Sequence, residues 1–78
     1  MKYADGQDVK VGDMVGLGED RGGVVVCDID AGDYTPNDAE SAWGYLKKGV
    51  MVVFPSYGHM YYESEMEEDV FLIARKQD

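Results

Sequence analysis

The distribution of apolar positions along the chain predicts a small β domain. An apolar run, Val24–Cys27, follows two glycines, and a second run, Val50–Phe54, begins directly after Gly49. Short continuous runs rich in β-branched residues and opened by a turn signal are typical of strands buried on both faces. The two runs therefore predict central strands at 22–29 and 50–54.

Three shorter segments have strand character and flank these two runs. They span residues 13–18, 59–62 and 70–74, and glycine, proline or charged residues separate them. The charged stretch 19–23 predicts a hairpin loop of about four or five residues between the first two strands. The acidic stretch 63–69 predicts a loop before the last strand. Five strands result.

The segment between the second and third predicted strands has a helical pattern. Thr35, Pro36 and Asp38 form a possible capping box, with Thr35 as the N-cap. The apolar residues Ala39, Ala42, Trp43 and Leu46 then recur at helical spacing before Lys47-Lys48-Gly49. One helix or helical turn is predicted within 36–48. Gly44 disfavours it by about 1 kcal/mol relative to alanine, so the helix is expected to be short or broken.

These elements predict one mainly β domain over residues 1–78. Short antiparallel strands in so small a chain favour a five-stranded, partly open barrel or roll, because closure removes exposed strand edges. The helical excursion lies between strands 2 and 3 of this arrangement. A second arrangement, an α+β sheet with the helix covering one face, fits the same pattern.

The first predicted hairpin resembles a known family. Val11-Gly12-Asp13-Met14-Val15, followed by Gly22-Gly23-Val24, is similar to the opening of SH3-like barrels of the KOW type, over about residues 9–29. That resemblance implies the barrel fold. Many such domains contact RNA through basic loops, whereas this hairpin carries Glu19 and Asp20 beside the single Arg21, so the RNA-binding role is not carried over.

The net charge of the chain distinguishes between the possible classes of partner. Sixteen Asp and Glu against seven Lys and Arg give a formal net charge of −9, which repels phosphate backbones and anionic lipid. Nucleic acid and membrane surfaces are therefore not expected as direct partners. Basic protein surfaces are attracted, although acidity also serves solubility alone.

Two segments concentrate the carboxylates. The stretch 28–40 holds five, and the stretch 63–69 holds five more. If both lie on one side of the fold, they form a single negative face, and exposed tyrosines beside it would supply large contact area. Trp43 is expected in the core, whereas Tyr34 and Tyr57 are expected to be exposed in loops. The predicted partner-binding residues are Asp28, Asp30, Asp33, Tyr34, Tyr57, Glu63, Glu65 and Glu67.

Little in the chain indicates catalysis or metal binding. Cys27 is the single cysteine, which excludes an internal disulfide and a cysteine-based zinc site, and its place in a buried strand predicts an inert thiol. His59 is the single histidine and is expected on a strand, facing solvent or a partner. The stretch from Asp28 departs from a calcium loop at its fifth, sixth and twelfth positions. No cofactor is expected.

The sequence therefore predicts a non-enzymatic, acidic protein-binding domain. In type it resembles the small, cytosolic, acidic immunity proteins of bacterial toxin–immunity systems, which implies an inhibitor that occludes a basic toxin. The N-terminal stretch lacks an apolar signal region, so the cytoplasm is the expected compartment. Two alternatives stay open: an accessory or docking module of a larger assembly, and a metal- or histidine-dependent enzyme.

Overall fold

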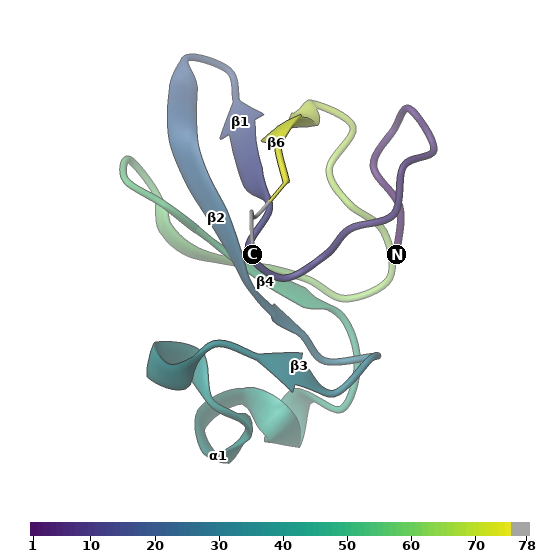
Figure 1. Ribbon diagram of the computed structural model, residues 1–78, viewed down its shortest axis with the longest axis vertical. Coiled ribbons are helices and arrows are strands. Elements are labelled where there is room, and N and C mark those ends of the chain that lie inside the picture. The colour runs from purple at the N-terminus through teal and green to yellow at the C-terminus, as the bar shows by residue number, and fades with distance from the viewer. Residues whose placement is uncertain (76–78) are drawn as a thin grey trace.

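The computed structural model describes residues 1–75, which form an open antiparallel sheet and one helical excursion (Figure 1). The strand order is β5-β4-β2-β1-β6, and the short β3 pairs with the end of β2. The mainly β prediction is confirmed, and all five predicted strands occur within two residues of their expected bounds. The strands are β1 (Met14–Leu17), β2 (Asp20–Asp28), β3 (Asp33–Tyr34), β4 (Val50–Phe54), β5 (Gly58–Tyr62) and β6 (Val70–Ala74).

The number of strands and the first turn differ from the prediction. The two-residue β3 is a sixth strand, and within residues 1–75 no ladder joins the edge strands β5 and β6. Leu17 lies opposite Asp20, so the turn has two residues instead of four or five. Gly18, with φ 61°, supplies the positive φ of a tight hairpin turn. The Asp20 carboxylate accepts hydrogen bonds from the backbone N–H of Gly22 (3.1 Å) and Ser56 (2.8 Å), which fixes this charged stretch as strand.

Strand β4 and residues 25–27 of β2 are buried on both faces, as their apolar runs predict, whereas Val24 of β2 is exposed. On the inner face, side chains from β1, β2, β4 and β6 form one cluster that includes Val15, Val25 and Phe54. On the outer face, Cys27 and Met51 form a second cluster under the helical excursion. The pairing of β2 with β4 shifts register between Val25 and Cys27. This β-bulge turns Cys27 outward, so the consecutive residues Val26 and Cys27 both lie in the outer cluster.

The helical excursion is broken into three short pieces. A 3₁₀ turn (Pro36–Asp38), the helix α1 (Glu40–Trp43) and a second 3₁₀ turn (Gly44–Leu46) follow one another. Ala39 is extended and interrupts the helix, and the Thr35 side chain makes no capping bond. The predicted capping box is therefore wrong. The final turn ends on Lys47, whose φ is 69°, and the excursion lies at the end of the molecule opposite β1 and β6 (Figure 1).

The N-terminal segment 1–13 is part of the core. A bridge pairs Lys2 with Asp8, and the enclosed turn at Gly6 has φ 92°. Tyr3 and Val9 insert into the inner cluster with exposed fractions of 3% and 4%. The chain start consequently lies beside the segment that joins β5 to β6 (Figure 1).

Candidate functional site

Two of the predicted acidic residues face one another across neighbouring strands. Asp28 ends β2 and lies directly opposite Asp33 of β3. Cross-strand neighbours share one face of a sheet, and like charges placed there are destabilising. Both carboxylates line a hollow of about 450 Å³ whose remaining lining includes Asp8, Lys10, Val9, Val11 and Met1.

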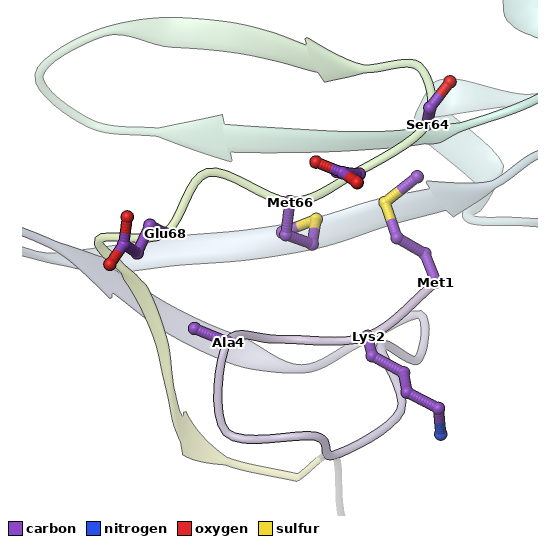
Figure 2. A pocket seen from close by; sticks show the side chains of 7 residues that line it. Met1, Lys2, Ala4, Ser64, Met66 and Glu68 are labelled. Atoms are coloured by element: carbon purple, nitrogen blue, oxygen red, sulfur yellow. The ribbon is translucent and has the colours of Figure 1, made fainter.

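A second hollow lies between the acidic loop 63–69 and the start of the chain. Its volume is about 370 Å³, and its lining combines Glu65 and Glu68 with the apolar Met1, Ala4 and Met66. Figure 2 shows the Met1 and Met66 side chains side by side between the loop and the N-terminal segment. Both methionines also pack against the inner core cluster. Lys2 and Ser64 complete the lining.

Met1 lines both hollows and thereby joins the two acidic segments. The surface made by Asp8, Asp28, Asp33, Glu65 and Glu68 around Met1 is termed the acidic surface below. Its cations are Lys2 and Lys10, and Lys2 pairs with Asp8 at 2.7 Å. That ammonium lowers the pKa of Asp8, so Asp8 carries its charge at neutral pH. The acidic surface thus combines methionine and valine side chains with carboxylates in the lining of its hollows.

Asp28 Oδ1 accepts a hydrogen bond from the Ala31 backbone N–H (3.3 Å), and other predicted carboxylates also have partners within the protein. Asp30 accepts a hydrogen bond from the backbone N–H of Gly49 (3.2 Å), at the entrance to β4. Glu63 forms an ion pair with Lys48 (3.4 Å). Glu67 accepts a hydrogen bond from the Tyr62 hydroxyl (3.3 Å). Burial raises the pKa of Tyr62 to about 12, and the Glu67 charge adds to this effect.

The two predicted tyrosine anchors lie apart from one another. Tyr57 is 56% exposed, as expected, and it lies in the β4–β5 turn, where its ring meets Phe54 edge-on at 6.0 Å. The whole of β5 separates it from Glu63 and the acidic loop (Figure 1). Tyr34 was expected to be exposed in a loop. Instead it pairs with Cys27 in β3 and packs half-buried on the outer cluster.

A polar cluster beneath the excursion was not anticipated from the sequence. One oxygen of Asp38 accepts a hydrogen bond from Trp43 Nε1 (3.0 Å) and contacts His59 Nε2 at 2.8 Å. The Trp43 and His59 rings lie 5.4 Å apart, and Trp43 is partly buried against the outer cluster. The Cys27 thiol donates to the Asp38 carbonyl oxygen (3.1 Å). These contacts fasten the excursion to β2 and β5.

A carboxylate–imidazole pair acts in nucleophilic catalysis only when it activates a nucleophile. The thiol near it belongs to Cys27, which is fully buried. Burial, and secondly the Asp38 charge, raise the pKa of Cys27 to about 11. The expected buried position of Cys27 is confirmed, and the thiol is protonated at neutral pH.

A second unanticipated network surrounds Asp13, which is 1% exposed. Its Oδ2 accepts hydrogen bonds from the Tyr3 hydroxyl (2.6 Å), the Lys10 backbone N–H (2.9 Å) and Arg75 Nη1 (2.9 Å). Arg75 Nη1 also donates to the Asp8 carbonyl oxygen (2.7 Å). The aspartate of the Val-Gly-Asp motif therefore ties the chain start to the end of β6, beside the acidic surface.

Within residues 1–75, no group of three or more His, Cys, Asp and Glu side chains could hold a metal ion. The same residues include no helix that is long and apolar enough to cross a membrane. Comparisons with protein-family models, with curated proteins and with solved structures found no match for this chain.

Proposed function

We propose that this protein is a non-enzymatic binding domain whose acidic surface receives a basic, partly apolar segment of another protein. The observation that carries the proposal is the direct opposition of Asp28 and Asp33 on paired strands. Two like charges at such positions reduce stability, and a bound cation would relieve their repulsion. Their arrangement therefore suits a basic ligand better than solubility alone does.

The composition of the two hollows supports the same partner. A methionine side chain lies beside carboxylates in both, and valine side chains add to the lining of the hollow at Asp28 and Asp33. Long basic side chains have the complementary form, because lysine and arginine bury their hydrocarbon stems while the charged head stays at a polar rim. The negative charge of the acidic surface also accelerates its encounter with a basic surface.

The more specific form of the proposal is an inhibitor of the immunity-protein kind, acting in the cytoplasm of a bacterium. A toxin that acts on nucleic acid or nucleotides needs a basic cleft, and carboxylates on a rigid sheet would occupy the positions of phosphates there. A related proposal concerns the fold: the sheet is a roll of the SH3-like KOW type. Two features support this fold proposal. The β1–β2 hairpin, which has a two-residue turn, follows Val11-Gly12-Asp13, and one inner cluster is shared by β1, β2, β4 and β6.

The test compares two doubly neutralised variants. Asp33→Asn with Glu65→Gln removes one exposed carboxylate from each hollow, and Glu19→Gln with Glu40→Gln removes two exposed carboxylates elsewhere. The probe is a synthetic peptide of alternating arginine and leucine, with binding measured by calorimetry at several salt concentrations. We expect the first variant to bind about fivefold more weakly, since two exposed charge pairs are lost and each contributes about 0.5 kcal/mol.

The matched variant decides the interpretation. It should bind nearly as well as the wild-type protein and show the same dependence on salt. Equal weakening of both variants would mean that only net charge attracts the peptide, and the acidic surface would lose its assigned role.

A further inference from the structure

Met66 is the only apolar residue in the acidic loop 63–69. Its side chain is half-buried, whereas the rest of the loop is exposed, and it packs against the inner core cluster. Figure 2 shows it beside Met1, in the hollow between the loop and the N-terminal segment. Met66 therefore supplies the apolar contact between this loop and the core.

The side-chain contacts that the carboxylates of the loop make are exposed. Glu63 pairs with Lys48 (3.4 Å), and Glu67 accepts a hydrogen bond from the Tyr62 hydroxyl (3.3 Å). Exposed polar pairs contribute little to stability, because both groups are also well solvated when they are apart. A methionine side chain that packs on a core removes apolar surface from water. The position of the loop therefore depends mainly on Met66.

The Met66 thioether is also accessible to small molecules. It lines the hollow of about 370 Å³, which is large enough for a molecule the size of hydrogen peroxide. Met1 lines the same hollow. Of the other methionines, Met14 on β1 is 45% exposed, whereas Met51 in the outer cluster is 3% exposed. These two residues provide references for an accessible and an inaccessible thioether.

We propose that Met66 is a modification site, oxidised by hydrogen peroxide to the sulfoxide, and that this change releases the loop 63–69 from the core. The thioether sulfur attacks one peroxide oxygen and the O–O bond breaks, so one molecule of peroxide gives one methionine sulfoxide and one molecule of water. The sulfur loses two electrons, and the peroxide is reduced. Methionine sulfoxide is polar, and packing it against an apolar cluster without a hydrogen bond is unfavourable. Methionine sulfoxide reductases reverse a modification of this kind.

The consequence for the acidic surface rests on the proposed function. Glu65 and Glu68 line the hollow from the same loop as Met66, so release of the loop displaces both carboxylates. The oxidised protein should then bind the arginine–leucine peptide more weakly. Oxidation and release are both measured without a peptide, and the two proposals can therefore fail independently.

The first experiment measures access to the thioether. The folded protein is exposed to hydrogen peroxide, and mass spectrometry of proteolytic fragments follows the sulfoxide at each methionine over time. We expect Met66 to be oxidised within about tenfold of the rate of the exposed Met14 and about tenfold or more faster than the buried Met51, because susceptibility follows exposure. Slower oxidation of Met66 would refute the site.

The second experiment measures release of the loop through the Val70 amide, which donates to the Glu67 carbonyl oxygen (3.0 Å). Hydrogen exchange of this amide is followed by NMR before and after oxidation. Met66→Leu keeps the apolar contact but cannot form a sulfoxide, and Met14→Leu is the matched control. We expect oxidation to accelerate exchange by about tenfold in the wild-type protein and in Met14→Leu, and to leave Met66→Leu unchanged. Unchanged exchange in the oxidised wild-type protein, equal acceleration in Met66→Leu, or an acceleration that Met14→Leu abolishes would refute the proposal.

Discussion

Asp13 is a buried carboxylate that accepts three hydrogen bonds on one of its oxygens, Oδ2. Tyr3, the Lys10 backbone and Arg75 all donate to its Oδ2, and a hydrogen bond to a charged group contributes about 1.5–3 kcal/mol. Tyr3→Phe keeps the ring in the inner cluster and removes one donor. We expect it to lower the free energy of unfolding by about 2 kcal/mol, measured by urea denaturation.

Two comparisons isolate this hydrogen bond. Tyr45→Phe changes an exposed hydroxyl and should stay within about 0.5 kcal/mol of the wild-type protein. In an Asp13→Asn background, Tyr3→Phe should lower stability much less, because the charged acceptor is gone. If Tyr3→Phe is equally destabilising in both backgrounds, the hydroxyl does not act through Asp13.

The burial of the Cys27 thiol makes the stability of the protein depend on pH. Its folded-state pKa of about 11 lies above the ordinary value of 9.0, so the neutral thiol is favoured in the folded protein. This contribution to stability is complete below about pH 9 and is lost as the pH rises toward 11. Chemical denaturation across this range should show the wild-type protein losing more stability than Cys27→Ala. Parallel pH profiles would contradict the assignment.

At the scale of the elements, the local pattern of apolar residues was sufficient to predict the five longer strands. It was insufficient to predict the short β3 and the length of the β1–β2 turn. The runs at 22–29 and 50–54 predict strands because apolar residues on both faces need two buried clusters, and the structure has both. The two-residue β3 has no pattern of its own and exists by pairing with Cys27 and Asp28. The β1–β2 turn was predicted too long because Asp20 acquires a backbone donor, Ser56, from the distant β4–β5 turn.

The excursion shows a tertiary contact overriding a local motif. The spacing of Thr35 and Asp38 predicts a capping box, but the Asp38 carboxylate contacts Trp43 and His59 instead. Asp38→Ala should therefore release the excursion from β5 and lower the free energy of unfolding by about 2 kcal/mol. Trp43 fluorescence should shift to longer wavelength as the indole becomes hydrated. The exposed neighbour Asn37→Ala should change neither quantity, and unchanged fluorescence in Asp38→Ala would contradict this account.

At the scale of the whole molecule, the candidate site depends on a segment that the pattern of apolar residues did not emphasise. The carboxylates of 28–33 and 63–69 were identifiable from composition. Their common neighbour, Met1, is placed by Tyr3 and Val9 in the inner cluster, which is a long-range packing effect. Sequence reasoning therefore found acidic residues of the site but not the hollows that group them or the role of Asp8.

The same charge distribution acts on folding itself. The molecule measures 31 × 26 × 22 Å, while the Debye length falls from about 30 Å at 0.01 M salt to about 8 Å at 0.15 M. At low salt every carboxylate therefore interacts with all others, and at moderate salt only with its neighbours. We expect the melting temperature to rise by several degrees between these conditions, since about 1 kcal/mol shifts it by roughly 4–8 °C in a domain of this size. Calorimetry of the wild-type protein and of Glu19→Gln with Glu40→Gln measures the effect, which should be smaller in the variant. A melting temperature that stays constant or falls would mean that local ion pairs such as Lys2–Asp8 and Lys48–Glu63 outweigh the net repulsion.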